Sequence, residues 1–487
     1  MLSSPAIRCS LLILAASTLC PSALAEAAPG RPNLLLVFID DMGWGDLSCF
    51  REDSAPGPTT EHIDRLAAEG LRFTQFYVNS PICSPSRCAI TTGQYPQRWR
   101  ITSYLDNRRA NKRRGVADWL DPEAPTLARE LQRSGYATGH FGKWHLGGQR
   151  DVGDAPLITR YGYDQSLTNF EGLGPRVLPL CDAHDGRAPH PHALGSDKLG
   201  RGPIEWRDRA YVTQAFTESA IRFIQAAAHR GQPFYVNLWP DDVHSPFFPP
   251  ADLRGDGGKR ARYHGVLDAM DQQLGELFTL IRDDPRLRDN TLILVCSDNG
   301  PEPGAGSAGP LRGVKATLYE GGVRSPLIAW GPGVLADGVR DAVNDNSVLA
   351  AFDLPPTLLA IAGIESPLVD RADGQPLPDV IRGASRASHQ GPIFFRRPPD
   401  RNRFGGVPDA NLPDLAVRDG RWKLLCEYDG ADAQLYDLGQ DPGETTNVAG
   451  EHSAVTQRLT RAAVDWHAAM PPDRGPELQA RAAQRAQ

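Results

Sequence analysis

The chain has 487 residues, 40% of them hydrophobic and 23% charged, a composition typical of a globular protein with a sizeable apolar core. This length allows one large domain and a smaller one. The formal net charge of −7 is small for such a chain, so composition gives no support for nucleic-acid binding, and a polyanionic ligand would need a local basic patch.

Residues 1–25 are predicted to form a secretory signal peptide. Arg8 precedes an apolar stretch over 11–19, and Ala23-Leu24-Ala25 fits a cleavage site after Ala25. The stretch is too short to cross a bilayer, and no later segment approaches about 20 uninterrupted apolar residues, so no stable membrane span is expected. We therefore expect an exported protein, either periplasmic or secreted.

Four short apolar runs are each followed directly by polar residues with catalytic potential. The runs 34–39, 137–141, 234–238 and 292–296 lead into DD, GKWH, WPDDVHSP and SDNG, in that order. Helical patterns occupy segments between them, at 62–70, 124–134, 211–228 and 263–282. This alternation predicts an α/β sandwich around a mostly parallel sheet. Ligands bind such sheets beyond the carboxyl ends of the strands, which is where these polar residues fall.

The remaining segments are less periodic. Residues 148–206 are rich in Gly, Pro, His and Asp, and we expect loops that shape a substrate pocket. Near the end, AVRDGRWKLLCEY and QLYDLGQDP predict a small antiparallel sheet, followed by a helix over 453–469. The predicted organisation is a signal peptide (1–25), a catalytic α/β domain (26–380), a C-terminal subdomain (381–470) and a flexible tail (471–487).

Six cysteines lie beyond the predicted signal peptide, without the dense spacing of small disulfide-rich domains. Cys296 lies within an apolar run and is expected to be a buried free thiol. Cys83 is different, because PICSPSRCAITTG (81–93) surrounds it with turn and helix-start residues. Pro85 just inside a helix, preceded by Ser84, would put residue 83 at the positive end of the helix dipole. A Cys83–Cys88 disulfide is the structural alternative.

Two polar pairs at strand ends are candidate metal ligands. Asp40 and Asp41 follow the first apolar run, and Asp298 and Asn299 follow the fourth. Because all four donors are oxygens, they favour a hard cation such as Ca²⁺ or Mg²⁺ over zinc. Each pair alone is common in turns, but their shared position after strands predicts one cation site.

Further loops carry cationic side chains, namely Arg87, Lys143, His145, His244 and Lys315. Taken singly, each would be a solvated charge or a structural histidine. Together they could surround a tetrahedral oxyanion, with Arg and Lys neutralising its oxygens and a histidine giving a proton to the departing alcohol. Such a cluster beside a carboxylate-held cation indicates hydrolysis of a sulfate or phosphate ester.

The segment CSPSRCAITTG is similar to the signature of type I sulfatases, in which the cysteine of Cys-x-Pro-x-Arg is oxidised after synthesis to Cα-formylglycine. Further similarity lies in RPNLLLVFIDDMGWGDL, GYATGHFGKWHLG, SDNGPEPG, LYEGGVRSPLIAWGPG and LYDLGQDPGETTNVA, and covers nearly the whole mature chain. The pattern resembles secreted bacterial arylsulfatases and N-acetylgalactosamine-6-sulfatase-like enzymes. This resemblance implies an alkaline-phosphatase-like fold.

The resemblance also implies a role for each candidate residue. The cation, Ca²⁺ rather than Mg²⁺, would be held by the modified residue 83 together with Asp40, Asp41, Asp298 and Asn299. Arg87 would hold the hydrated formylglycine. The sulfate-binding and proton-transfer positions are matched by Lys143, His145, His244 and Lys315. A formylglycine-generating maturation enzyme is then a required partner.

The chemistry of an aldehyde supports these roles. Its hydrate has two hydroxyls, one of which can attack sulfur near the cation while His244 or Lys315 assists the leaving alcohol. Removal of the proton from the second hydroxyl, assigned to His145, then expels sulfate and regenerates the aldehyde. One difficult displacement is thus divided into two easier steps.

The expected substrate is a carbohydrate sulfate, in a glycosaminoglycan or algal-type glycan, attacked at a chain end. Trp239 and Asp242, with Asp241, are expected to line the subsite for the sugar ring beside His244. The basic run 108–114 either helps a polyanionic sugar approach or forms a solvated loop. Sugar contacts or plain loop positions are expected for His184, His190 and His192, whose spacing matches no zinc module.

Two other functions stay open at this point. One is a phosphonate or phosphodiester hydrolase of the same superfamily, since sulfate and phosphate esters are poorly separated by sequence alone. The other is an exported glycan-binding protein that keeps the fold without turnover.

Overall fold

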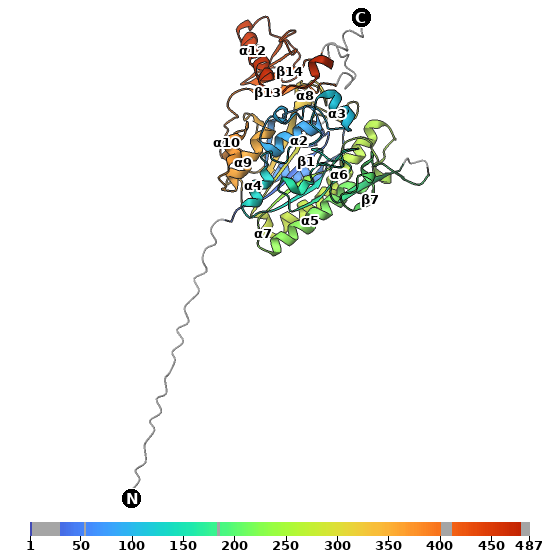
Figure 1. Ribbon diagram of the computed structural model, residues 1–487. Helices are drawn as coiled ribbons and strands as arrows, with labels where there is room; N and C mark the ends of the chain where they lie inside the picture. The colour runs from blue at the N-terminus through green and yellow to red at the C-terminus, as the bar shows by residue number, and fades with distance from the viewer. Residues whose placement is uncertain (2–29, 53–54, 183–185, 401–411, 479–487) are drawn as a thin grey trace. The chain divides into compact units, whose positions relative to one another are not determined.

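A large sheet forms the centre of the fold in the computed structural model, which describes residues 1, 30–52, 55–182, 186–400 and 412–478 (Figure 1). Its strands are β1 (Asn33–Ile39), β2 (Leu71–Tyr77), β3 (Ala137–Gly142), β4 (Gln165–Leu167), β8 (Phe234–Trp239), β9 (Thr291–Ser297), β10 (Arg324–Trp330), β11 (Ala342–Asn344) and β12 (Leu349–Ala350). They lie in the order β11-β2-β10-β9-β1-β8-β3-β4, with β12 also paired to β2. β10 runs antiparallel to β2 and β9 and the other pairs are parallel, which confirms the predicted mostly parallel sheet.

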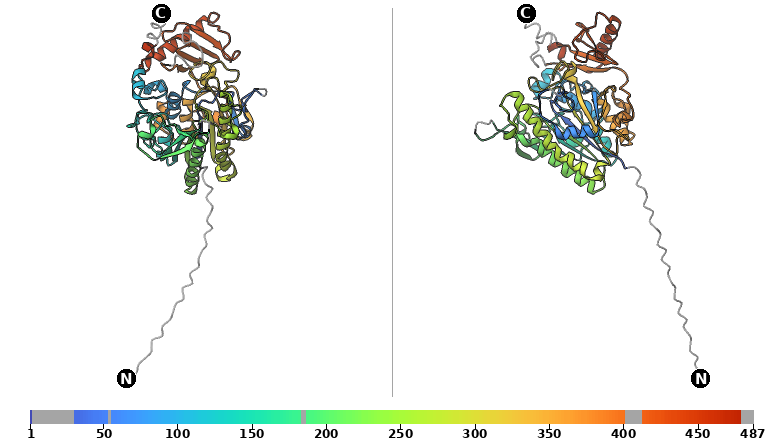
Figure 2. Two further views of the ribbon diagram at one scale, coloured as in Figure 1. Left: turned by 90° about the vertical axis from the view of Figure 1, so that its right-hand side faces the viewer. Right: turned by 180° about the vertical axis from the view of Figure 1, so that it is seen from behind.

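Helices cover both faces of this sheet (Figure 2). The helices of the described residues are α1 (Glu61–Glu69), α2 (Cys83–Thr92), α3 (Arg108–Arg114), α4 (Leu127–Arg133), α5 (Val212–His229), α6 (Lys259–Asp283), α7 (Pro285–Arg288), α8 (Glu320–Val323), α9 (Leu354–Ile361), α10 (Pro367–Arg371), α11 (Pro378–Ile381) and α12 (Ser453–Ala469). The even-numbered side chains of β1 from Leu34 to Phe38 share a core with α2, α4 and α9. The odd-numbered ones from Leu35 to Ile39 share a core with α1, α5 and α6. β1 is therefore apolar throughout because both of its faces are buried.

The expected core elements are confirmed with small changes in their bounds. The four apolar runs form β1, β3, β8 and β9, and the four helical patterns form α1, α4, α5 and α6. Cys296 is the expected buried free thiol. In the described part of the chain, no helix is both long and apolar enough to cross a membrane. The predicted signal peptide, apart from Met1, lies outside the described residues.

The segment 148–206 contains more regular structure than expected. β4 extends the central sheet, and a further sheet has the order β6-β5-β7, with β5 (Arg176–Cys181), β6 (His190–Pro191) and β7 (Ile204–Asp208). Val177 of β5 is fully buried in the core that contains α5. The expectation of loops alone is therefore wrong. The sequence did not reveal these strands because they are too short and too rich in Pro and charged residues to show an alternating pattern.

The basic run at 108–114 is a helix, α3, so the expectation of a solvated loop is wrong. The Asn107 side chain caps its first turn by accepting from Ala110 N at 2.9 Å, and Gly115 ends it in the left-handed conformation. An Asn before and a Gly after the run are ordinary helix start and stop signals. Arg109, Lys112 and Arg113 are exposed.

The predicted antiparallel sheet near the C-terminus is confirmed. Its order is β13-β14-β15-β16, with β13 (Ile393–Arg396), β14 (Leu415–Asp419), β15 (Trp422–Cys426) and β16 (Gln434–Asp437). α12, which has the predicted bounds, packs against β14 and β15 through Leu459, Ala463 and Trp466. The domain boundary near residue 380 stays a prediction.

The expected flexible tail does not begin at residue 471. The side chain of Asp473 is buried, accepts from Thr102 Oγ1 at 2.5 Å and pairs with Arg396. Arg474 N donates to the Arg114 carbonyl at 3.0 Å. These contacts anchor the segment after α12, and residues 479–487 lie outside the described chain.

A buried ion cluster joins the C-terminal sheet to α8. Nζ of Lys423, on β15, lies 2.9 Å from Glu320 Oε1 and 3.0 Å from Glu444 Oε1, and all three side chains are inaccessible to solvent. Tyr77 OH donates to Glu320 Oε2 at 2.7 Å. Burial raises the pKa of Glu444 to about 7, and Lys423 opposes this increase. The lysine therefore compensates two carboxylates that would otherwise repel each other.

We expect Lys423→Met to lower the free energy of unfolding by about 3–5 kcal/mol at pH 8, because it leaves buried carboxylates without their cation. The loss should be smaller at pH 5, since Glu320 and Glu444, with pKa values raised by the substitution, then take up protons and lose their repulsion. Denaturant unfolding at the two pH values measures this. Lys259→Met is the control, as Lys259 is half exposed and should change stability by less than about 1 kcal/mol. An equal loss at both pH values would contradict the assignment.

Candidate active site

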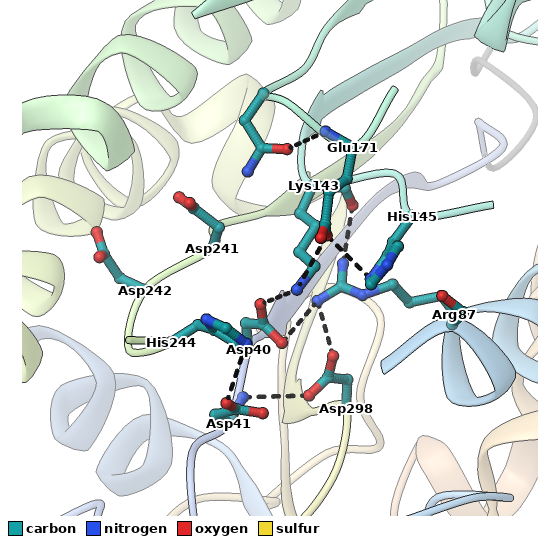
Figure 3. Close-up of polar contacts among 12 residues, drawn as sticks. Asp40, Asp41, Arg87, Lys143, His145, Glu171, Asp241, Asp242, His244 and Asp298 are labelled. Carbon is teal, nitrogen blue, oxygen red and sulfur yellow. Dashed lines mark hydrogen bonds and ion pairs between the residues drawn. The ribbon is translucent and has the colours of Figure 1, made fainter. Parts of the chain in front are cut away.

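The ends of β1 and β9 bring the two polar pairs together. The strands are parallel neighbours, so Asp40-Asp41 and Asp298-Asn299 leave the sheet at the same edge. Asp298 N donates to the Ile39 carbonyl at 3.0 Å, and Asp41 N donates to Asp298 Oδ1 at 3.1 Å. Carboxylate oxygens of Asp40, Asp41 and Asp298 lie within 4.8 Å of one another, and all three residues are buried (Figure 3).

This donor set fits a hard cation. Oδ1 of Asp40 and Oδ1 of Asn299 are buried and have no hydrogen-bond partner among the described residues. Asn299 Nδ2 donates to Asp41 Oδ1 at 2.8 Å, which fixes the orientation of the amide. Burial and the neighbouring Asp40 raise the pKa of Asp298 well above its usual value. A divalent cation bound by these oxygens would relieve the repulsion, and Ca²⁺ and Mg²⁺ prefer such ligands.

Cys83 is the first residue of α2 and lies beside the carboxylates. Its Sγ is within 4.8 Å of ligand atoms of Asp40 and His244. Burial and the charge of Asp40 raise the pKa of the Cys83 thiol well above its usual value, so it is a poor thiolate nucleophile. Pro85 lies in the first turn of α2, as expected. The thiols of Cys83 and Cys88 are both free, so the alternative disulfide is not formed.

Arg87 lies one turn further along α2 and is fully buried. Its Nη2 lies 2.8 Å from Asp298 Oδ2 and 3.4 Å from Asp40 Oδ1, and its Nη1 donates to the Lys143 carbonyl at 2.8 Å. These contacts connect α2 to the ends of β1, β3 and β9. Arg87 therefore holds the backbone after β3 against the carboxylate pair (Figure 3).

Two lysines and a histidine reach the carboxylates of Asp40 and Asp41 from separate loops. Lys143 Nζ lies 2.6 Å from Asp40 Oδ2, Lys315 Nζ lies 2.5 Å from Asp41 Oδ2, and His244 Nε2 lies 3.6 Å from Asp41 Oδ2. Burial opposes the charge of Lys143, but Asp40 holds the pKa of this lysine well above its usual value. Both lysines are buried, whereas the His244 side chain is 30% exposed. His244 is thus the member of the cluster most open to a substrate.

The turn that carries Lys143 and His145 depends on Gly142. This glycine has φ of 125°, and a Cβ here would lie 1.9 Å from the Trp239 carbonyl oxygen. Only glycine therefore lets the ends of β3 and β8 come this close. His145 follows with its Nε2 donating to the Leu105 carbonyl at 2.9 Å.

Glu171 was not singled out from the sequence. Its Oε2 lies 3.2 Å from Lys143 Nζ and 2.9 Å from His145 Nδ1, and the residue is buried. In the sequence it is an isolated acidic residue in TNFEGLG, within the segment expected to be loops, and no spacing marks it. It joins the site only because the chain after β4 folds back on the turn after β3.

The contact of Asp242 with substrate stays a prediction, and the structure shows which groups of the protein hold this side chain. Nη1 of Arg209, in the 3₁₀ turn Arg209–Tyr211, lies 2.6 Å from Asp242 Oδ1, and Thr213 Oγ1 donates to Asp242 Oδ2 at 2.5 Å. Nη2 of Arg209 also donates to the carbonyls of Asp241 and His244, at 3.4 Å each. Both aspartates are buried and lie apart from the cluster around Asp40 (Figure 3). They and Arg209, a residue missed in the sequence, hold the loop that carries His244.

Trp239 is a core residue, so the expectation that it lines a sugar subsite is wrong. It has no exposed surface, and its ring lies 5.3 Å from that of Phe38 and 5.1 Å from that of His140. Arg87 lies over the same indole, 5.5 Å from the ring centroid. Trp239 is the last residue of β8, and its ring packs against the Arg87 guanidinium group.

The histidines of the 148–206 segment do not form a metal site among the described residues. His190 is exposed, and His192 is half-buried with its ring 5.9 Å from that of Phe170. His184 lies outside the described residues. The expected sugar contacts of these side chains stay a prediction.

Comparison with known proteins matches residues 32–364 to the family described as Sulfatase and residues 314–466 to N-sulphoglucosamine sulphohydrolase, C-terminal. The chain is 33% identical to arylsulfatase A of Homo sapiens over 494 residues, covering 93% of this chain and 89% of that protein. It is 33% identical to N-acetylgalactosamine-6-sulfatase of Homo sapiens over 390 residues, covering 77% and 70%. Among solved structures, Ps i-CgsB in complex with k-i-k-neocarrahexaose is 24% identical, with a TM-score of 0.72 and coverage of 90% and 92%. These similarities confirm the alkaline-phosphatase-like fold.

We expect Asp298→Asn to weaken Ca²⁺ binding by at least about tenfold, ~1.4 kcal/mol, because it removes one of three clustered carboxylate charges. Isothermal titration of the purified protein with CaCl₂ measures the affinity. Asp271→Asn is the matched control, since this carboxylate is equally buried but accepts from the backbone N of His62 and Ile63, at 3.0 Å each. Equal Ca²⁺ affinities for the two variants would rule out a cation site at Asp298.

Proposed function

The chain belongs to the sulfatase family and is a sulfuric ester hydrolase, and we propose that it releases inorganic sulfate from a sulfated carbohydrate through a formylglycine formed from Cys83. One observation carries the proposal: Cys83 starts α2 within 4.8 Å of ligand atoms of Asp40 and His244. A buried thiol with a raised pKa has little chemistry of its own at this place. An aldehyde derived from it would lie close to both the Asp40 carboxylate and the His244 imidazole.

When formed, the hydrated aldehyde supplies two hydroxyls, one to attack sulfur and one whose deprotonation expels sulfate. Lys143 and Lys315 hold the oxygens of the sulfate group and compensate its charge. His244 donates its Nδ1–H to the Ser245 carbonyl at 2.6 Å, so Nε2 is the nitrogen that protonates the leaving alcohol. His145 is assigned the later proton transfer; its Nε2 donates to the Leu105 carbonyl at 2.9 Å and its Nδ1 faces Glu171 Oε2 at 2.9 Å.

The cation site belongs to the same proposal. Asp40, Asp41, Asp298 and Asn299, with residue 83, would hold Ca²⁺, and Mg²⁺ is the alternative. A bound cation supplies electrostatic stabilisation for negative oxygen atoms. Arg87 keeps Asp40 and Asp298 in place through its ion pairs with both.

The proposed substrate is a sulfated saccharide, in a glycosaminoglycan or algal-type glycan, with the sulfate at a chain end. Support comes from the relative named N-acetylgalactosamine-6-sulfatase. On this chain, the exposed Arg109, Lys112 and Arg113 of α3 lie a few residues beyond Leu105, whose carbonyl contacts His145. Such cations favour the approach of a polyanion. Export through the N-terminal segment and maturation by a formylglycine-generating enzyme complete the proposal.

We expect Cys83→Ala to lower kcat/KM for an aryl sulfate by at least about 10³-fold, ~4 kcal/mol, because no nucleophile remains. Mass spectrometry of the peptide containing residue 83 should show the aldehyde in active wild-type protein. Cys88→Ala is the matched control, since Cys88 is a buried thiol on the same helix that the reaction does not use. An intact Cys83 thiol in fully active protein would refute the aldehyde mechanism.

A panel of defined sulfated saccharides, with an aryl sulfate and an aryl phosphodiester alongside, tests the substrate class. We expect release of sulfate from a terminal sugar at a kcat/KM at least about tenfold above that for the phosphodiester, a difference of ~1.4 kcal/mol in activation free energy. Faster phosphodiester turnover would favour the phosphonate or phosphodiester alternative. Tight binding of a sulfated glycan without sulfate release, by protein that carries the aldehyde, would favour the non-catalytic one.

A further inference from the structure

Glu171 places a buried negative charge inside the cluster that is proposed to bind sulfate. Its Oε2 lies 2.9 Å from His145 Nδ1 and 3.2 Å from Lys143 Nζ (Figure 3). Its side chain is 8% exposed, so water screens these contacts poorly. The same Lys143 Nζ lies 2.6 Å from Asp40 Oδ2 on its other side. Lys143 therefore forms ion pairs with two carboxylates, that of Asp40 in the cation site and that of Glu171.

The position of Glu171 is fixed by its backbone. His145 N donates to the Glu171 carbonyl at 2.7 Å, and Glu171 N donates to Asn169 Oδ1 at 3.2 Å. Thr168 Oγ1 donates to the Gly142 carbonyl at 2.8 Å, which ties the same segment to the end of β3. The Glu171 carboxylate, the Lys143 ammonium group and the His145 imidazole thus sit on backbone segments that are hydrogen-bonded to each other.

The contacts of His145 leave Nδ1 for Glu171. Nε2 must donate to Leu105, because a carbonyl oxygen only accepts. A neutral ring would then direct the Nδ1 lone pair at the Glu171 carboxylate, whereas a proton on Nδ1 would be shared with it. Glu171 is therefore the group that orients the imidazole and receives its Nδ1–H when the ring is protonated.

We propose that Glu171 is a positioning residue of the sulfate-ester reaction, which orients Lys143 and His145 and limits how tightly the basic cluster holds inorganic sulfate. This inference rests on the roles proposed above for Lys143 and His145. A sulfate monoester carries one negative charge and free sulfate carries two. A fixed negative charge nearby therefore raises the free energy of the bound product twice as much as that of the bound substrate.

The test compares two changes at this position. Glu171→Gln keeps the shape of the side chain and removes its charge, whereas Glu171→Asp keeps the charge and shortens the reach. Glu61→Gln, at an exposed position on α1, is the control for net charge. Turnover of an aryl sulfate is measured with inorganic sulfate as inhibitor, and thermal unfolding confirms that each variant is folded.

For Glu171→Gln we expect kcat to fall at least about tenfold and the inhibition constant of sulfate to fall about tenfold. KM should fall about threefold, the square root of the change for sulfate, because the substrate carries half the charge of the product. For Glu171→Asp we expect a similar fall of kcat with the inhibition constant within about twofold of wild type. Glu61→Gln should leave all three constants unchanged. If Glu171 had only a structural role, both Glu171 variants would have a lower unfolding temperature. The inhibition constant of sulfate would then not differ between the variant that loses the charge and the variant that keeps it.

A kcat within about twofold of wild type in both Glu171 variants would overturn the proposal, and so would unchanged sulfate inhibition in Glu171→Gln. If Glu171→Gln does not fold, the test rests on Glu171→Asp, in which kcat should fall while the inhibition constant of sulfate stays close to that of wild type. The function proposed above is judged separately by Cys83→Ala. An inactive Cys83→Ala beside unaffected Glu171 variants refutes only this inference, whereas an active Cys83→Ala refutes the function on which it rests.

Discussion

Pairing of buried opposite charges at the ends of β1 and β9 is the interaction on which the site depends. Asp40, Asp41 and Asp298 each have a cationic partner, Lys143 at 2.6 Å, Lys315 at 2.5 Å and Arg87 at 2.8 Å, in that order. An unpaired buried ion costs several kcal/mol, so each partner has to be held accurately. Since the partners come from distant segments, the rest of the fold acts mainly to bring these segments to one edge of the sheet.

The central sheet does this through its parallel strands. Their carboxyl ends deliver the two acidic pairs and Lys143 at the same edge, and α2 packs across the even-numbered face of β1 so that its first turn meets them. The Lys315 loop is fixed from two sides: Lys315 N donates to the Pro301 carbonyl at 3.1 Å, and Ala316 N to the Pro81 carbonyl at 2.8 Å. The C-terminal sheet reaches α8 through Lys423 of β15, which pairs with Glu320, and α8 in turn accepts a hydrogen bond at the Gly322 carbonyl from Gly300 N, at 3.0 Å, directly after Asn299. The C-terminal sheet therefore helps to hold a segment next to the active site.

A second set of charges orients the groups that are proposed to face substrate. Arg209 holds the carbonyls and carboxylates of the loop that carries His244, and Glu171 holds His145 and Lys143. These residues do not lie at the ends of the predicted strands, and their neighbours in the sequence carry no recognisable pattern. Buried charges need partners, and each of these partners fixes the orientation of a group with a proposed role in the reaction.

The sequence by itself determined the central strands and helices, because apolar runs and helical periodicity are local. It also determined the candidate residues at strand ends, since Asp40-Asp41 and Asp298-Asn299 directly follow buried runs and the Cys83 signature is contiguous. Only the tertiary structure decided which neighbours of these motifs are packed in the core or paired with other buried charges. Trp239 and Asp242 adjoin His244 in sequence, yet one is core and the other is neutralised by Arg209. Conversely, Glu171 joins the site through contacts between the segments after β3 and β4, because burial and charge pairing are set by neighbours in space that spacing along the chain does not reveal.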